Sequence, residues 1–487
     1  MAADDHTPAT EAAGLHGELA RTLGPLQLIA IGIGAIIGTG IFVITGTAAA
    51  TYAGPAVIIS FIIAGTGCVF AGLCYAELAA MIPVSGSAYT YAYAAFGRFA
   101  AWVIGWDLVL EYGVSASTVA VGWSGYFGGL MKDFGLPALP EALSSAPVAF
   151  QDGAFVFTGA LINLPAVAIV ILLSALLMFG VRSSANANGL MVFFKVAVVL
   201  LVILFGLPLI HAQNLDPFIP PNTGKFGEFG WSGILRASGV IFFAYIGFDA
   251  VSVAAQESRN PQRDMPIGIL GSLAICTVLY LLMSLTMVGL TSYTNLKVPN
   301  PVSVAIAAAG PELHWLGFWV NIGAIVGLST VILVSLYGQS RIFYSMARDG
   351  MLPQYFAKVH PVYGTPVNGT FATCIGVCIL AAFLPLDILG ELVSIGTLLA
   401  FVLVCIGVIV LRFTKPNVVR PFRTPGSPIV PLLGVAFCGA MMFSLPPETI
   451  YRLVVWFGIG LLIYAMYGVR HAKKPVWSLD DAPQKEG

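Results

Sequence analysis

Long apolar runs separated by short polar segments repeat along almost the whole chain. A membrane-crossing helix needs about 20 mainly apolar residues, because each adds 1.5 Å across a hydrocarbon core about 30 Å thick. Twelve runs meet this requirement: 26–48, 54–81, 98–130, 160–180, 188–210, 232–254, 266–290, 313–340, 367–385, 388–411, 427–445 and 449–469. The alternation typical of membrane β-barrels is absent, so the pattern predicts an all-α integral membrane protein with twelve transmembrane helices.

The composition supports this prediction. Charged residues make up 9% of the 487 residues, against about 25% in an ordinary soluble domain. The net charge of −1 also removes the electrostatic basis for binding nucleic acid. The seven cysteines lie inside apolar runs, which favours small buried hydrophobes over zinc ligands or disulfides. We therefore expect no metal site and no cofactor.

The basic residues indicate how the chain is oriented, because Lys and Arg accumulate on the cytoplasmic side of a membrane protein. With the N-terminus inside, sixteen fall in cytoplasmic segments: Arg21, Arg98, Arg182, Arg259, Arg263, Arg341, Arg348, Lys358, Arg412, Lys415, Arg420, Arg423, Arg470, Lys473, Lys474 and Lys485. Three fall in external loops, namely Lys132, Lys225 and Lys297, while Lys195, Arg236 and Arg452 lie in or beside spans. Residues 1–25 show no signal-peptide core, so 1–25 and 471–487 are expected to be cytoplasmic tails of a membrane domain over 26–470.

The first apolar run contains four glycines, Gly32, Gly34, Gly38 and Gly40. Each costs about 1 kcal/mol relative to alanine in a helix. One interpretation is close helix packing through the small-xxx-small pair of Gly34 and Gly38. Another is that residues 38–40 unwind near mid-membrane, which frees backbone N–H groups for an anion. The two interpretations are compatible.

The sixth run repeats this theme, with Gly239, then Gly247 among aromatic residues and Asp249 two positions later. The first and sixth runs are five crossings apart, so a second five-helix unit starts from the opposite face of the membrane. Interrupted helices at matching places in two inverted halves, 26–210 and 232–411, point to a substrate site at the membrane midplane.

Four motifs resemble the amino acid–polyamine–organocation transporters, and within them the bacterial relatives of the cationic amino-acid transporters. They are Gly38-Thr39-Gly40-Ile41-Phe42, Phe243-Ala244-Tyr245-Ile246-Gly247-Phe248-Asp249, the stretch 257–266 from Glu257 to Pro266, and the stretch 337–353 from Tyr337 to Pro353. The similarity extends from about residue 20 to 470. It implies a LeuT-like fold of two inverted five-helix repeats, with helices 1 and 6 broken at mid-membrane, followed by two C-terminal helices over 427–469.

The resemblance also implies a substrate site. The substrate carboxylate would bind N–H groups around Ile36, Gly38, Thr39 and Gly40. Its α-ammonium would face carbonyl groups of the first half-helix and those near Phe243, Ala244 and Ile246, and Phe243 matches the aromatic gate of the family. An amino acid is a small dipole, and two broken helices offer it a positive and a negative end.

Ionisable side chains at membrane depth are candidates for coupling, because burying a charge there costs about 2.5–3.5 kcal/mol or more. Lys195 lies mid-span, where burial promotes proton release, although a permanently charged tie between helices is the alternative. The resemblance favours proton coupling, since proton-coupled members carry a lysine where sodium binds in sodium-coupled relatives. Glu111 is expected to pair with Lys195, directly or through water, with Asp107 one turn away as its competitor. Glu77 and Asp249 lie nearer to span ends, where a helix-end or an interhelical hydrogen bond is expected.

Ser335 lies in the eighth span, which borders the substrate side-chain pocket in this fold. A small residue leaves room for a longer substrate, whereas simple helix packing is the alternative. No unpaired acid is evident there to neutralise a cationic substrate. The resemblance to the cationic branch therefore does not decide between cationic and neutral amino acids.

The expected function is import of L-amino acids by proton symport through alternating access, in a bacterial cell membrane. An exchanger, a sodium-coupled symporter, a channel and a nutrient receptor are alternatives. A membrane enzyme is disfavoured, because the six histidines form no cluster and no P-loop exists. The expected partners are the substrate, protons and membrane lipid. The sequence leaves open a dimer or a single-pass subunit. Segments 87–96 and 301–310 look like interfacial helices on the inner and outer faces.

Overall fold

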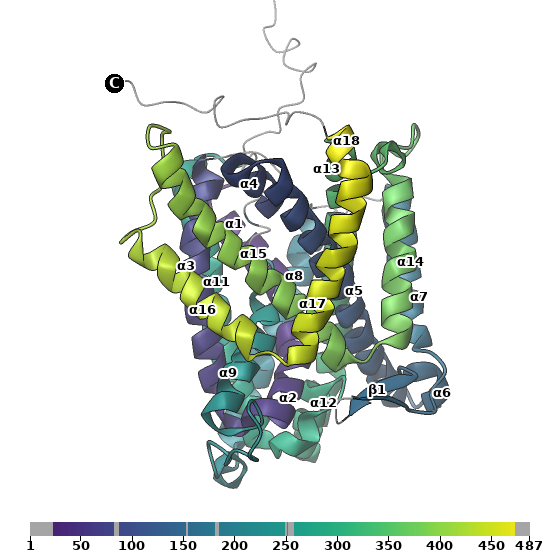
Figure 1. Cartoon of the computed structure of the whole chain (residues 1–487). Helices are drawn as coiled ribbons and strands as arrows, with labels where there is room; N and C mark the ends of the chain where they lie inside the picture. The colour runs from purple at the N-terminus through teal and green to yellow at the C-terminus, as the bar shows by residue number, and fades with distance from the viewer. Residues whose placement is uncertain are drawn as a thin grey trace, which may run out of the picture.

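The computed structural model describes residues 23–81, 87–151, 154–180, 185–248, 251 and 258–472. Most of these residues form helices that run side by side in one elongated bundle (Figure 1). The α-helices are α1 (Pro25–Ile36), α2 (Thr45–Ala48), α3 (Val57–Met81), α4 (Ser87–Phe96), α5 (Arg98–Asp133), α6 (Glu141–Ser144), α7 (Leu164–Met178), α8 (Ala185–Gly206), α9 (Gly230–Ile241), α11 (Pro261–Leu290), α12 (Pro301–Ala308), α13 (His314–Arg348), α14 (Val367–Phe383), α15 (Leu386–Thr414), α16 (Ile429–Ser444), α17 (Pro447–Ile463) and α18 (Val469–His471).

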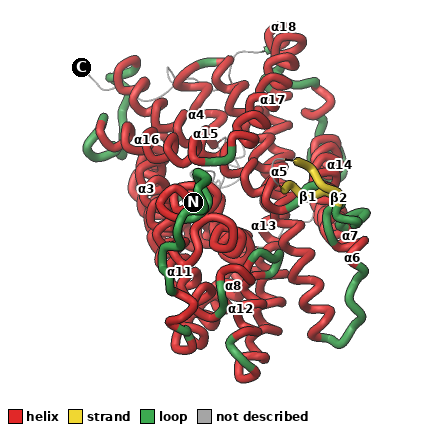
Figure 2. Tube along the Cα trace, turned by 60° about the horizontal axis from the view of Figure 1, so that its bottom comes forward, coloured by secondary structure: helices red, strands yellow, loops and turns green. Residues whose placement is uncertain are grey.

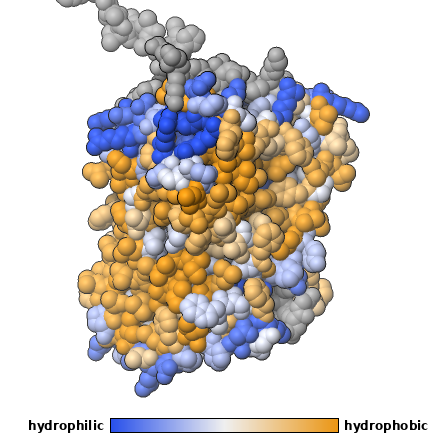
Figure 3. Space-filling view, turned by 60° about the vertical axis from the view of Figure 1, so that its left-hand side comes forward, coloured by the Kyte–Doolittle hydropathy of each residue, from blue (hydrophilic) through white to orange (hydrophobic). Residues whose placement is uncertain are grey.

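The bundle has the surface of a membrane protein. Within the described residues, six helical segments are long and apolar enough to cross a membrane: Gly40–Met81, Gly189–Leu209, Pro261–Leu290, Pro311–Arg348, Leu386–Thr414 and Pro447–His471. Four shorter helices, α1, α7, α14 and α16, are also apolar. Figure 3 shows a broad apolar band across the visible face, with hydrophilic residues gathered toward the two ends. Large apolar side chains such as Phe193 and Leu172 are exposed, which suits contact with lipid.

The described residues are mostly helical, as predicted, and include a short β-hairpin that the sequence did not predict. Strand β1 (Val148–Gln151) pairs antiparallel with β2 (Ala154–Phe157), with Val148 opposite Phe157 and Gln151 opposite Ala154. The hairpin lies at the edge of the molecule beside α7 and α14 (Figure 2). Its aromatic and β-branched residues favour strands. Four-residue strands are too short to produce a recognisable alternation in a sequence dominated by apolar runs.

Two groups of helices form the interior. The long helices α5 and α13 pack against each other, and α11 packs against both α1 and α3. Small residues permit close approach: a Cβ atom added at Gly122 of α5 would lie 2.7 Å from Val43, and one added at Gly323 of α13 would lie 2.7 Å from Val198 of α8. In lipid, the hydrophobic effect does not drive helices together, so close van der Waals packing of this kind stabilises their association.

The segment after α11 covers the end of the bundle opposite α18 (Figure 1). A Cβ atom added at Gly46 would lie 2.4 Å from Pro301, and one at Gly125 would lie 2.4 Å from Pro299. The Asn321 side chain of α13 accepts a hydrogen bond from Ser303 at 2.7 Å and donates one to Asp133 at 2.6 Å. This segment, which includes α12, is therefore fastened to both α5 and α13.

Candidate functional site

The first helical segment is interrupted within the glycine-rich motif. Helix α1 ends at Ile36, and the backbone of Ile37 is extended, with φ −71° and ψ 105°. A π-helical turn starts at Gly40, and the Phe42 N–H donates to the Gly38 carbonyl at 3.2 Å. The amides just before Phe42 thus lie in the first turn of a helical segment, where N–H groups have no intrahelical acceptor. They form a local positive end inside the bundle.

The segment after α9 changes direction in a comparable way. Helix α9 ends at Ile241 and continues as a 3₁₀ turn over Phe242–Tyr245. Ile246 then turns extended, with ψ 136°, and Gly247 has φ +119°. A side chain at Gly247 would be strained, because few L-residues adopt this conformation. Because the helix does not continue, the carbonyl groups at the end of this turn lack the regular α-helical N–H partners four residues later.

The two interruptions touch each other directly. A Cβ atom added at Gly40 would lie 2.2 Å from the Ala244 Cα atom, and one added at Gly247 would lie 2.6 Å from the Ala35 carbonyl carbon. Both glycines are therefore required for backbone-to-backbone contact. The contact brings the amide end of one segment close to the carbonyl groups of the other.

Tyr280 of α11 joins the two interruptions and was not singled out from the sequence. Its hydroxyl lies 2.8 Å from the Ile36 carbonyl oxygen and 2.7 Å from the Ala244 carbonyl oxygen, and the side chain is fully buried. One hydroxyl proton thus serves two backbone acceptors, one on each interrupted segment. The only available signal was a tyrosine inside an apolar run, whose hydroxyl needs a partner at membrane depth.

The structure brings most of the predicted substrate residues together. Ile36, Gly38, Thr39, Gly40, Phe243 and Ala244 all belong to the two touching interruptions and are buried, whereas Ile246 is half-buried at the turn. The Thr39 hydroxyl has no hydrogen-bond partner within the described residues. The binding roles of these residues, and the gating role of Phe243, stay predictions.

Ser335 borders this region from α13. A Cβ atom added at Gly38 would lie 2.8 Å from Val331, one turn before Ser335 on the same helix. The Ser335 hydroxyl lies 3.5 Å from the Ser115 hydroxyl of α5. Val331, Ser335 and Ser115 are all uncharged.

Lys195 of α8 is fully buried, and its ammonium donates a hydrogen bond to the Gly34 carbonyl of α1. A Cβ atom added at Gly327 of α13 would lie 3.4 Å from the lysine stem. Lys195 therefore lies between α1 and α13. Its acceptor, Gly34, is two residues before the end of α1 at Ile36. Glu111 of α5 is also buried. The pairing of Glu111 with Lys195 stays a prediction.

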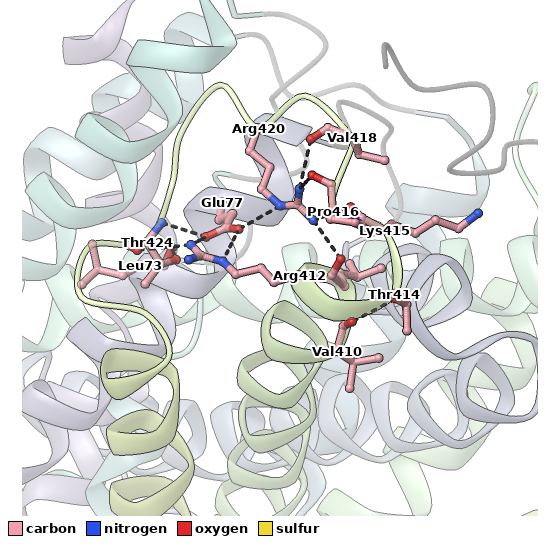
Figure 4. A network of polar contacts seen from close by, with 11 residues as sticks. Leu73, Glu77, Val410, Arg412, Thr414, Lys415, Pro416, Val418, Arg420 and Thr424 are labelled. Carbon is pink, nitrogen blue, oxygen red and sulfur yellow. Dashed lines mark hydrogen bonds and ion pairs between the residues drawn. The ribbon is translucent and has the colours of Figure 1, made fainter. Parts of the chain in front are cut away.

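Glu77 makes the interhelical contact expected of it. The buried carboxylate of this α3 residue accepts hydrogen bonds from the Arg412 guanidinium at 2.6 and 3.2 Å and from the Thr424 N–H at 2.7 Å. Arg420 adds an ion pair at 3.5 Å (Figure 4). Burial lowers the pKa of the Arg420 guanidinium, an effect that Glu77 opposes. Asp249, for which a similar contact was expected, lies outside the described residues.

A second buried acid, Glu391 of α15, fastens the opposite end of the bundle. It accepts hydrogen bonds from Tyr52 at 2.9 Å and from Thr449 at 2.6 Å, and it forms an ion pair with Arg452 of α17 at 3.4 Å. Tyr52 lies in the helical segment that follows the first interruption. Glu391 therefore links that segment to α15 and α17.

Comparison with known proteins identifies the family. The profile described as "Amino acid permease" matches residues 23–469. The chain belongs to the amino acid permease family. This permease is 45% identical over 454 residues to the "Methylthioribose transporter" of Bacillus subtilis (strain 168), covering 93% of this chain and 95% of the relative. It is also 45% identical over 456 residues to the "Branched-chain amino acid permease BcaP" of the same organism, covering 93% and 94%.

The permease also resembles plant proteins. It is 38% identical over 404 residues to the "Cationic amino acid transporter 4, vacuolar" of Arabidopsis thaliana, covering 82% of this chain and 64% of the relative. The resemblance to this superfamily and to its cationic branch, stated from four motifs, is thereby confirmed. All three relatives are named as transporters or permeases rather than as enzymes.

Proposed function

We propose that the permease is a secondary active transporter that imports uncharged L-amino acids, with branched-chain amino acids as the first class to test. The observation that carries this proposal is the contact between two interrupted segments, with Tyr280 bonded to both. Amide groups at Gly38, Thr39 and Gly40 supply donors for a carboxylate. The carbonyl groups of Ile36 and Ala244 supply acceptors for an α-ammonium.

The preference for an uncharged substrate rests on two further points. The Ser335 hydroxyl lies beside the uncharged Ser115, and Glu111, one turn further along α5, is assigned to the proposed proton step. A buried cationic substrate would then lack a counter-ion. In addition, one relative at 45% identity is named for branched-chain amino acids. The equally similar relative named for methylthioribose makes that uncharged compound the second candidate.

The proposed topology has twelve membrane crossings, arranged as two inverted five-helix repeats and two C-terminal helices. Both termini are cytoplasmic, which places the α4 and α18 end of Figure 1 inside and the α12 end outside. The sixteen basic residues assigned to the inner segments support this orientation. The interruptions then lie near mid-membrane, where substrate sites of this architecture form.

Proton coupling is proposed to act through Lys195. A charged ammonium donates a stronger hydrogen bond than a neutral amine does. Loss of its proton would therefore weaken the tie to the Gly34 carbonyl and loosen α1 near its interrupted end. Movement of α1 would open the site toward the cytoplasm, and Glu111 is the proposed acidic partner in this step.

Uptake of labelled L-leucine by purified protein in liposomes tests the proposal. Leucine should accumulate when the lumen is alkaline and the outside acidic, without sodium, and unlabelled valine should compete better than arginine. Leucine counterflow would distinguish a carrier from a channel. Sodium-dependent accumulation, competition by arginine alone, or uptake of methylthioribose without leucine would each overturn the corresponding part of the proposal.

A further inference from the structure

Asp107 is a buried acid with an unusual lack of partners. It lies in α5 with 0% of its side chain exposed, and neither carboxyl oxygen has a hydrogen-bond partner within the described residues. Glu77 and Glu391, by contrast, are each held by several donors. An ionised carboxylate at membrane depth needs such donors. The surroundings of Asp107 therefore match its neutral, protonated form.

Helix α15 covers the Asp107 side chain. A Cβ atom added at Gly396 would lie 3.1 Å from the Asp107 Oδ1 atom and 3.7 Å from Leu110. Glu111 is the nearest acid on α5 itself. Titratable and charged groups on the helices packed around α5 have described contacts of their own. On α15 and α17, Asp387 pairs with Lys297, Glu391 with Arg452, and Arg412 with Glu77. On α4, α13 and α14, Tyr89 bonds to Asp349, Arg348 pairs with Asp349, Arg341 lies over Tyr337, and Cys374 lies beside Cys378. Tyr91 and Tyr93 are the remaining titratable side chains of α4.

Polar residues continue from Asp107 along one side of α5. Asp107, Glu111 and Ser115 follow at intervals of four residues, which places them on neighbouring turns of the same face. Ser115 then meets Ser335 at the candidate substrate site. Because a helix rises 1.5 Å per residue, this column spans about 12 Å between the substrate site and Asp107. Asp107 occupies the end of the column nearer to Arg98, where α5 begins.

We infer that Asp107 binds the transported proton on the inner side of the substrate site and releases it to the cytoplasm. The inference rests on the proposed proton symport. Release breaks the Asp107 O–H bond and gives the proton to cytoplasmic water when the contact with Gly396 opens. The carboxylate that remains then takes the proton from the carboxyl group of Glu111, one turn away. Net charge is conserved at each transfer.

Substitution Asp107→Asn tests this role, because it keeps the size of the side chain and removes the titratable proton. The matched control is Thr118→Val, which alters another buried polar side chain of α5 whose hydroxyl bonds only within its own helix, to the Val114 carbonyl at 2.8 Å. Wild type and both variants should show leucine counterflow at equal pH. An inward gradient of about two pH units supports about hundredfold accumulation for one proton per substrate. Only Asp107→Asn should lose that accumulation.

Accumulation by Asp107→Asn equal to that of wild type overturns the inference and leaves the proposed symport intact. Absence of accumulation by wild type overturns the symport itself. If Asp107→Asn does not fold, infrared spectra of the wild type carrying ¹³C-labelled aspartate decide. A protonated-carboxyl band that shifts with the label at neutral pH in wild type, and that is missing from Asp107→Glu, supports the inference. A labelled wild type without such a band, or a band that Asp107→Glu retains, overturns it.

Discussion

The Glu77 cluster and the interrupted-helix centre both bury polar groups, but they satisfy them in opposite ways. Glu77 is surrounded by two guanidinium groups and a backbone N–H, all contributed by α15 and the loop that follows it. At the centre, Lys195 and Tyr280 bond to backbone carbonyls at the end of α1. A charge with a full set of partners fixes two elements together. The contacts of Lys195 and Tyr280 with backbone carbonyl groups involve no opposite charge, so we expect them to break more easily than the Glu77 cluster.

The largest effect on folding is expected from Glu77→Gln. The substitution leaves Arg412 and Arg420 without their carboxylate, and breaking a buried ion pair in this way costs about 3–5 kcal/mol. We expect a sharp fall in the yield of folded protein and in its unfolding temperature in detergent. The control is Glu228→Gln, which removes one partner of the exposed Lys225 pair at 3.6 Å. An unfolding temperature of Glu77→Gln equal to that of the control would show that the cluster does not hold the fold.

Lys195→Met tests the interrupted-helix centre in the same way. Here we expect a loss of transport rather than a loss of folded protein. The variant loses one hydrogen bond to the Gly34 carbonyl, worth about 1–3 kcal/mol, and also removes a costly buried charge. The unfolding temperature should therefore change less than in Glu77→Gln. Leucine accumulation driven by a pH gradient should disappear. A Lys195→Met protein that still accumulates leucine with an alkaline lumen would exclude Lys195 from coupling.

Tyr280→Phe should have an intermediate effect that is confined to substrate affinity. Removing the hydroxyl leaves the Ile36 and Ala244 carbonyl groups without their shared donor and loosens the contact between the two segments. Loss of such a hydrogen bond, at about 1.4 kcal/mol, corresponds to about a tenfold rise in KM for leucine uptake. Tyr89→Phe is the control, because its hydroxyl is also buried but bonds to the Asp349 carboxylate at 2.7 Å rather than to an interrupted segment. Equal KM values for the two variants would count against a special role of Tyr280.

Sequence patterns predicted the membrane character and the family, because both depend on local composition and on contiguous motifs. They also singled out Gly40 and Gly247, since glycine in an apolar run signals close approach or an unusual backbone. Gly40 shows the first, against Ala244, and Gly247 shows the second, with φ +119°.

The partners of individual side chains were beyond the reach of the sequence. Tyr280 is separated from Ile36 by 244 residues, and Glu77 is separated from Arg412 by 335. No local rule connects such positions, so only the folded chain shows which polar groups meet. For the same reason, the sequence favoured Glu111 over Asp107 as the coupling acid. The lack of hydrogen-bond donors around Asp107 is visible only in the folded chain.

The smallest effect is expected from Lys297→Ala, at the end of the bundle that the proposed topology places outside. Lys297 forms an ion pair with Asp387 at 3.7 Å, and the two side chains are 58% and 39% exposed. Water and salt screen such a pair, so its loss should change the free energy of unfolding by about 1 kcal/mol at most. Uptake should stay close to wild type, because the segment remains fastened by the Asn321 contacts and by packing against Gly46. A large change in uptake without a change in unfolding temperature would mean that this exposed pair, unlike the buried Glu77 cluster, controls opening of the outer face.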